Sequence, residues 1–204
     1  MLVKRIPAGV YAANCYILMD EISKECAVID PGGDAEDIDS YLSKIDAKVK
    51  YILLTHGHLD HTGAVGYFKE KYNIQAYINA ADGKLILENN FMLGPLKYKA
   101  QDVKLQMDVN EASKFNIGSI TIEVIETPGH TPGGVCYKAE NNIFTGDTLF
   151  LRSIGRTDLT GGNFDTLIRS IKSKLLVLNE DVIVYPGHGP MSSIGYEKAN
   201  NSFL

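Results

Sequence analysis

All five histidines of this 204-residue chain stand in three short motifs whose spacing could bind metal. Three of them lie in one heptapeptide, residues 55–61 (THGHLDH). The other two lie in pentapeptides that share the pattern P-G-H-x-P, residues 128–132 (PGHTP) and 186–190 (PGHGP). Imidazole is the commonest side-chain ligand for transition metals in proteins. The motifs therefore predict a metal site.

Two aspartates complete the predicted set of donors. Asp60 lies inside the heptapeptide, and Asp147 ends a predicted strand in the sequence TGD. Imidazole and carboxylate suit Zn²⁺, Mn²⁺ or Fe²⁺, and no thiolate stands at these positions. Seven donors exceed one tetrahedral site and predict two metal ions that share a bridging ligand. The predicted metal ligands are His56, His58, Asp60, His61, His130, Asp147 and His188.

Several of these residues also have a purely structural interpretation. A single histidine after a strand is usually a loop residue, and Asp147 could cap a turn. Asp60 and His61 fall at the start of a predicted helix, where an acidic residue is a good cap. His56 and His58, in contrast, are two residues apart in an extended loop and point the same way. Three histidines within seven residues favour metal binding over the structural alternatives.

Short strands with helices between them are expected to position these motifs. Apolar and β-branched runs predict strands at residues 15–19, 26–29, 50–55, 120–125, 135–137, 143–145 and 182–185. Helical spacing predicts helices at 34–45, 64–72 and 164–178. Most motifs follow a strand, so the donors should meet at one edge of a sheet. No change in composition marks a boundary, which predicts one α/β domain over residues 1–204 with layered sheets and helices.

Composition and charge exclude several classes of protein. The net charge is −5, and the 20 basic residues form no continuous stretch, which disfavours a nucleic-acid partner and favours a small-molecule substrate. No apolar run reaches the roughly 18 residues that a membrane span needs. The first residues lack the apolar segment of a signal peptide. The three cysteines are odd in number and widely spaced, so no disulfide framework is predicted and a cytoplasmic location is expected.

The order of the motifs resembles the metallo-β-lactamase superfamily, and within it the small glyoxalase II-like hydrolases. The resemblance rests on T-H-x-H-x-D-H, P-G-H-T-P-G, T-G-D and P-G-H-G-P, and it runs nearly from end to end. It implies a four-layer αββα sandwich with the metals at one edge. It also implies that His56, His58 and His130 bind one metal, that Asp60, His61 and His188 bind the second, and that Asp147 bridges them. Asp30 matches a residue that orients a ligand histidine, or it is simply a turn residue before Pro31.

The resemblance also implies a reaction. Two metals, zinc with iron or manganese as alternatives, would generate a bridging hydroxide that attacks a carbonyl, and Asp60 would position that nucleophile. Small acyl thioesters are the expected substrates. The chain departs from glyoxalase II because no helical glutathione-gripping domain follows the last motif and because Pro190 replaces an aromatic residue. Arg156 matches a basic residue of that family, so it either contacts the anionic end of the substrate or pairs with Asp158 at the surface.

Other functions stay open or are disfavoured. A persulfide dioxygenase-like oxygenase would use a single Fe²⁺ held by two histidines and one aspartate. A structural zinc module is disfavoured because four ligands would close it. A nuclease is disfavoured because this sequence shows no basic face or added domain. The B1 and B3 β-lactamase branches fit poorly because their cysteine ligand and a secretory signal are absent from this sequence. Residues 82–104, with Phe91, Met92, Leu93 and Tyr98, are either a substrate-side insertion or a helix packed on the sandwich, and Tyr11 has the same two interpretations.

Overall fold

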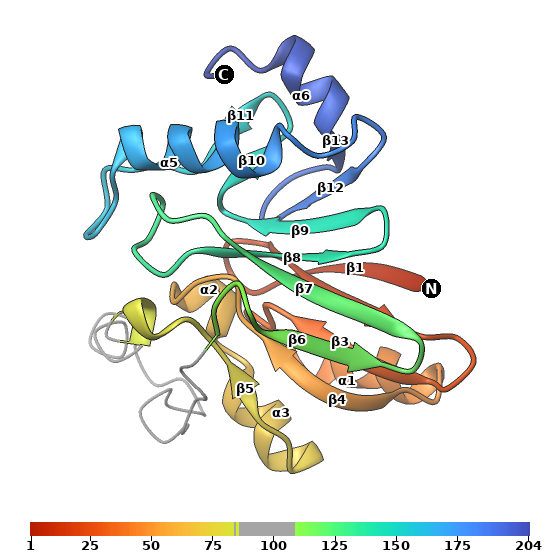
Figure 1. Ribbon diagram of the computed structural model, residues 1–204. Coiled ribbons are helices and arrows are strands. Elements are labelled where there is room, and N and C mark those ends of the chain that lie inside the picture. The colour runs from red at the N-terminus through yellow and green to blue at the C-terminus, as the bar shows by residue number, and fades with distance from the viewer. Residues whose placement is uncertain (84, 86–108) are drawn as a thin grey trace.

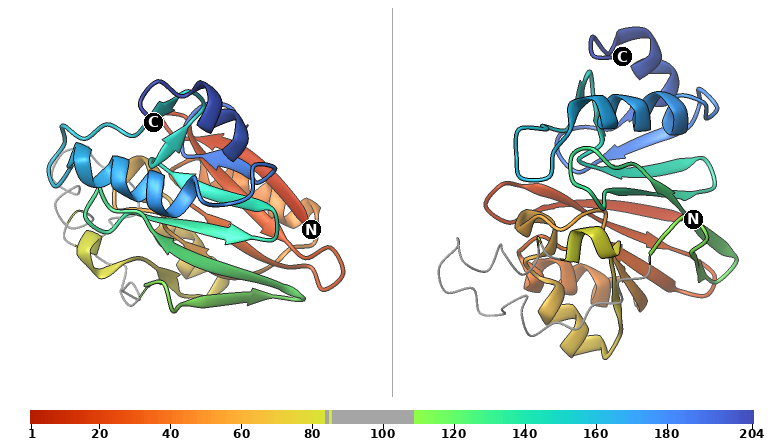
Figure 2. Two further views of the ribbon diagram at one scale, coloured as in Figure 1. Left: turned by 45° about the horizontal axis from the view of Figure 1, so that its top comes forward. Right: turned by 60° about the vertical axis from the view of Figure 1, so that its left-hand side comes forward.

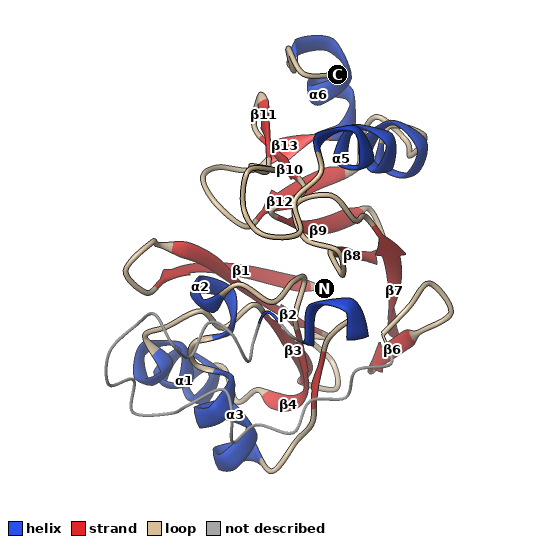
Figure 3. Ribbon diagram, turned by 90° about the vertical axis from the view of Figure 1, so that its left-hand side faces the viewer, coloured by secondary structure: helices blue, strands red, loops and turns tan. Residues whose placement is uncertain are grey.

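Two β-sheets pack face to face, and helices cover the outer face of each (Figures 1 and 3). The computed structural model describes residues 1–83, 85 and 109–204. The predicted four-layer αββα sandwich of the α/β class is therefore confirmed. The predicted substrate-side residues Phe91, Met92, Leu93 and Tyr98 lie outside the described residues.

The first sheet is built from the N-terminal part of the chain, and its strands follow one another in the order β1-β2-β3-β4-β5. The first three strands are antiparallel, whereas β3, β4 and β5 run parallel. Its strands are β1 (Leu2–Ala8), β2 (Ala13–Met19), β3 (Glu25–Ile29), β4 (Lys48–Leu53) and β5 (Ala76–Tyr77). The helical elements of this half are α1 (Ala35–Lys44), α2 (Leu59–Thr62), α3 (Val65–Tyr72) and the 3₁₀ turn η1 (Ala80–Asp82).

The second sheet has the order β13-β12-β9-β8-β7-β6, and β12 pairs with β9 in parallel. Its strands are β6 (Lys114–Ile117), β7 (Ile120–Glu126), β8 (Val135–Ala139), β9 (Asn142–Gly146), β12 (Ile183–Pro186) and β13 (Ser192–Ser193). A small hairpin joins β10 (Leu149–Phe150) to β11 (Ser153–Ile154). The helical elements of this half are α5 (Phe164–Ser170), the π-helical turn η3 (Ile171–Leu175) and α6 (Ile194–Asn200). Figure 2 shows α5 and α6 on the outer side of this sheet.

Three apolar layers hold the sandwich together. Strand β2 is buried on both faces, so Tyr16 and Leu18 point between the sheets while Ile17 packs toward α1 and α3. Tyr16 meets Phe144 of the opposite sheet edge to face, with ring centroids 5.2 Å apart. A third layer packs α5 and α6 on the outside of the second sheet. Burial on both faces explains why these strands are continuous apolar runs.

Most predicted elements are present, but the short strands β5, β10, β11 and β13 and the C-terminal helix α6 were not predicted. Strands β1 and β6 were not predicted, since β1 mixes Lys4, Arg5 and Pro7 into an edge strand and β6 has only four residues. The helix predicted at 164–178 divides, because the Leu176 amide donates to the Ile171 carbonyl in the register of a π-helix. Among the described residues, the longest helix has ten residues, and none is long and apolar enough to cross a membrane.

Candidate metal centre

The seven predicted donors meet where strands of both sheets end. His56 and His58 follow β4, and His58 precedes α2, which carries Asp60 and His61. The remaining three are His130 in the β7–β8 loop, Asp147 after β9 and His188 after β12. Parallel strands place their carboxyl ends at the same edge of a sheet. The sequence predicted one sheet edge, whereas the structure draws the donors from two sheets across the sandwich.

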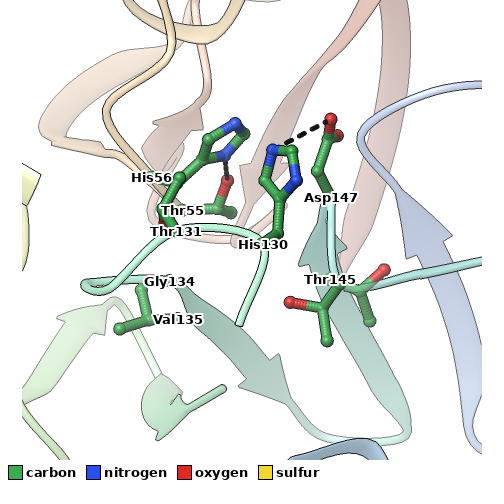
Figure 4. A pocket seen from close by; sticks show the side chains of 9 residues that line it. Thr55, His56, His130, Thr131, Gly134, Val135, Thr145 and Asp147 are labelled. Carbon is green, nitrogen blue, oxygen red and sulfur yellow. Dashed lines mark hydrogen bonds and ion pairs between the residues drawn. The ribbon is translucent and has the colours of Figure 1, made fainter. Parts of the chain in front are cut away.

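His56, His58 and His130 form the first group of donors. One ring nitrogen of each lies within 4.8 Å of the others. His58 Nδ1 is 3.0 Å from His130 Nε2. His56 and His130 are buried, and Figure 4 shows the His130 ring next to Asp147, with the His56 ring on its other side. The extended loop of residues 55–58 thus brings His56 and His58 to the same point, as their spacing predicted.

Asp60, His61 and His188 form the second group. His188 Nε2 lies 3.2 Å from Asp60 Oδ2 and 3.3 Å from His61 Nε2. His58, not Asp60, occupies the cap position of α2, and no side chain caps that helix. The capping alternative for Asp60 is therefore wrong, because its carboxylate faces the two histidines instead.

Asp147 lies between the two groups. Its Oδ1 is 3.3 Å from His61 Nε2, and its Oδ2 is 3.6 Å from His130 Nε2 and 3.7 Å from His188 Nε2. One carboxylate therefore faces donors of both groups, which is the arrangement expected of a bridging ligand.

Hydrogen bonds at the outer ring nitrogens fix the tautomers of two histidines. Thr55 Oγ1 donates to Asp30 Oδ2 at 2.6 Å, so this hydroxyl must accept from His56 Nδ1 at 3.0 Å. His61 Nδ1 donates to the same Asp30 oxygen at 3.0 Å. In their neutral forms, both rings then carry their lone pair on Nε2, toward the centre. The structure places Asp30 where an orienting residue would lie, buried behind the two rings.

The third histidine with a fixed tautomer is His130. Its Nδ1 lies 2.7 Å from the backbone carbonyl of Arg156, which can only accept, so Nε2 again carries the lone pair. Sequence reasoning gave no role to this carbonyl or to the Thr55 hydroxyl. The position of Thr55 directly before His56 in the heptapeptide was the available signal for the latter.

Two buried polar atoms indicate that the centre suits a cation. His56 Nε2 and Asp147 Oδ1 are buried and have no hydrogen-bond partner among the described residues. A buried acceptor without a partner is costly, whereas a bound divalent ion would satisfy both atoms. Nitrogen and carboxylate donors in these groups fit Zn²⁺, Fe²⁺ or Mn²⁺.

Protonation differs between the two groups. Burial lowers the pKa of His56 well below its usual range and lowers that of His58 to about 4. Burial also acts to lower the pKa of His61, but Asp147 and Asp30 outweigh it and raise the value. A hydrogen bond with Asp60 raises the pKa of His188. Burial opposes ionisation of Asp60, yet His188 and His61 hold its pKa at about 2.

The loop that carries His188 is held by the N-terminal hairpin. The Asn14 amide N–H donates to the Gly187 carbonyl at 2.7 Å, and Asn14 Nδ2 donates to the Gly189 carbonyl at 2.9 Å. Arg5 donates to the same Gly189 carbonyl at 2.8 Å. The position of His188 in the second group therefore depends on contacts between the β1–β2 hairpin and the loop that follows β12.

Two residues considered as substrate contacts lie at the surface. The Arg156 guanidinium pairs with both carboxylate oxygens of Asp158, each at 2.7 Å, and its side chain is 62% exposed. The surface ion pair that the sequence offered as an alternative is thus present. Tyr11 is exposed in the turn between β1 and β2.

Comparison with known proteins gives consistent matches over the whole chain. The sequence profile of the metallo-beta-lactamase superfamily matches residues 8–188. Hydroxyacylglutathione hydrolase GloC of Haemophilus influenzae is 37% identical, over 100% of this chain and 98% of its own length. The crystal structure of BLEG-1 B3 metallo-beta-lactamase aligns with a TM-score of 0.83 at 35% identity, over 100% of this chain and 99% of that one. TTHA1623 in a di-iron-bound form aligns with a TM-score of 0.83 at 30% identity, over 98% and 100%.

Proposed function

Because the chain belongs to the metallo-β-lactamase superfamily of hydrolases, we propose that it hydrolyses small acyl thioesters at a centre of two metal ions. The observation that carries the proposal is the convergence of seven donors in two groups with Asp147 between them. The 37% identity to a hydroxyacylglutathione hydrolase supports a thioester substrate. Zinc suits the donors, and the similarity to a di-iron-bound protein makes iron the second candidate, ahead of manganese.

Divalent ions held by His56, His58 and His130 and by Asp60, His61 and His188 would supply Lewis acidity, which lowers the pKa of water and polarises a carbonyl. Asp60 stays ionised at neutral pH and is partly exposed, so its carboxylate can accept a hydrogen bond from the attacking water and orient it. Asp30 and Thr55 hold the rings of His61 and His56 against rotation. All five histidines are taken up by the centre, which suits a thiolate leaving group because it departs with little protonation.

Arg156 is proposed to bind the anionic end of the substrate. Its exposed guanidinium already grips one carboxylate, that of Asp158, and can exchange it for another. Arg156→Ala should raise KM several-fold with little change in kcat, since it removes binding that ground and transition states share. Asp158→Ala is the matched control and should leave KM unchanged or lower it, because it frees the guanidinium. An unchanged KM in Arg156→Ala would contradict the role of Arg156 in substrate binding but not the proposed thioester hydrolysis.

The decisive test is a substrate panel on enzyme whose metal content has been measured. We expect zinc- or iron-loaded enzyme to hydrolyse lactoylglutathione and simpler acyl thioesters. A lactone and a β-lactam serve as comparison substrates, the latter because of the similarity to BLEG-1. Turnover of the β-lactam but of no thioester would overturn the proposal.

A second candidate is a mononuclear oxygenase acting on persulfides. His56, His130 and Asp147 line one pocket, drawn in Figure 4, and two histidines with one carboxylate can hold a single Fe²⁺ with open positions. Metal analysis separates the candidates. Two ions per chain under metal-replete conditions support the hydrolase, whereas one iron per chain with oxygen uptake on persulfide supports the oxygenase.

The proposed substrate is a small molecule, and the proposed setting is the cytoplasm. Cys15, Cys26 and Cys136 are buried free thiols, as expected of a reducing compartment. The charge of −5 argues against nucleic acid as the substrate. Salt-sensitive binding to RNA or single-stranded DNA at low micromolar concentration would contradict that last statement.

A further inference from the structure

One buried carboxylate outside the seven donors contacts both loops that carry the first group. Asp82 ends the 3₁₀ turn η1, and its side chain has no exposed surface. The Gly57 amide donates to Asp82 Oδ2 at 2.9 Å, and the Gly133 amide donates to Asp82 Oδ1 at 2.6 Å. Each oxygen of this carboxylate therefore holds a different segment of the chain.

The two amides lie next to the three histidines of the first group. Gly57 stands between His56 and His58, and Gly133 follows His130 by three residues in the same loop. The distance between these two loops sets the distance between His58 and His130, whose facing nitrogens are 3.0 Å apart. A single carboxylate that bonds both loops thus fixes the spacing of the first group.

Glycine at both positions lets the loops approach Asp82 closely. A Cβ atom at residue 133 would lie 2.7 Å from both the Asp82 amide nitrogen and Oδ1. A Cβ atom at residue 57 would lie 2.8 Å from the Asp82 carbonyl oxygen. Any side chain at either position would push Asp82 away from the loop.

Burial raises the pKa of Asp82, and the hydrogen bonds from the Gly133 and Gly57 amides act against that rise. Among the described residues, no lysine or arginine forms an ion pair with Asp82. A buried carboxylate without a cation is costly. Its two acceptor oxygens, however, satisfy two buried amide donors on two loops, which an asparagine amide group cannot do because one of its ends is itself a donor.

We propose that Asp82 is a positioning residue that sets the geometry, and therefore the metal affinity, of the group formed by His56, His58 and His130. It acts through the backbones of Gly57 and Gly133 and touches neither the metal nor the substrate. The proposal depends on the metal centre and not on the thioester substrate, so metal affinity tests it whatever reaction the enzyme catalyses.

The experiment isolates each group by removing a ligand of the other. In a His188→Ala background only the first group is intact, and in a His58→Ala background only the second. Zn²⁺ is titrated into each protein in competition with a chromophoric chelator, with and without Asp82→Asn. We expect Asp82→Asn to weaken zinc binding about 10- to 100-fold in the first background and less than about threefold in the second.

Asp20 provides the matched control. It is likewise a buried carboxylate that accepts two backbone N–H bonds, from Ile22 at 2.9 Å and from Ser119 at 2.7 Å. It follows the C-terminal end of β2, whereas Asn14, which contacts the His188 loop, lies at the opposite end of that strand. Asp20→Asn should lower the melting temperature without changing zinc affinity in either background.

Three results would overturn the proposal: no loss of affinity in the first background, an equal loss in both, or the same selective loss with Asp20→Asn. If circular dichroism shows that Asp82→Asn does not fold, Gly133→Ala replaces it. That variant keeps the carboxylate but places a methyl group against it. The same selective loss at the first group is then the expected result, and its absence overturns the proposal.

Discussion

The two groups of donors differ in charge, in exposure and in what supports them. The first group holds three imidazoles, two of them buried, and burial keeps the pKa values of His56 and His58 low. The second group includes the carboxylate of Asp60, and both Asp60 and His188 are partly exposed. The Thr55 hydroxyl and the Arg156 carbonyl orient rings of the first group, whereas a short helix and the N-terminal hairpin support the second.

This difference indicates a division of labour within one centre. The lowered pKa values of His56 and His58 keep these two imidazoles neutral at pH 7, so neither has to lose a proton before it could bind a metal. The second group offers its negative charge at the accessible side, where Asp60 can meet water and substrate. Asp147 faces donors of both groups and so connects them.

The largest predicted effect removes the residue that joins the groups. Asp147→Ala should reduce the metal content of both groups and lose more metal than any single His→Ala variant, because a bridging carboxylate serves both ions. Activity should fall at least about 100-fold. Elemental analysis after dialysis measures the metal content. Retention of two ions per chain would contradict the bridging role.

A smaller effect on both groups is expected from Asp30→Asn. The Asp30 carboxylate accepts directly from His61 and reaches His56 through the Thr55 hydroxyl, so both rings lose an orienting partner. Zinc affinity should fall about 10-fold or more at each group. Asp39→Asn removes a buried carboxylate that pairs with Lys71 far from the centre, and it should change stability only. A loss of zinc affinity confined to the second group would show that Thr55 does not carry the effect of Asp30 to His56.

The smallest predicted effect is a difference between the two groups in the pH at which they release zinc. A histidine whose pKa is raised holds its proton to higher pH, and that proton competes with the metal. The pKa values of His61 and His188 are raised, whereas those of His56 and His58 are lowered. Zinc should therefore leave the second group first as the pH falls below neutrality. Titrations of His188→Ala and His58→Ala variants measure each group alone, and equal pH midpoints would contradict the distinction.

The sequence predicted which residues donate to the site far better than it predicted which residues hold those donors in place. Every donor stands in a short motif after a strand, and a local motif can be found without knowing the fold. Of the residues that orient these donors, the family resemblance implied only Asp30. The Thr55 hydroxyl, 25 residues away from Asp30, and the Arg156 backbone carbonyl were not predicted. Asp82 stands in no motif at all, and only the meeting of two loops gives it a role.

Elements at the edges of the sheets were also hard to predict. β1 is half exposed and carries Lys4, Arg5 and Pro7, so its sequence has neither the alternation nor the continuous apolar run of a strand. Its pairing with β2 supplies what its own residues do not indicate. The interior strands, such as β2, were predictable because burial on both faces demands apolar residues throughout.

The attachment of the His188 loop to the N-terminal hairpin has a consequence for biosynthesis. His188 lies 127 residues after His61, so at roughly 5–20 residues per second the ribosome delivers it roughly 6–25 s later. Until β12 emerges and pairs with β9, Arg5 and Asn14 have no loop to hold. His56, His58 and His130 are translated well before that point. In the proposed two-metal centre, the three histidines of the first group would therefore all be synthesised before the second group is complete, and the second group would form only as the fold closes.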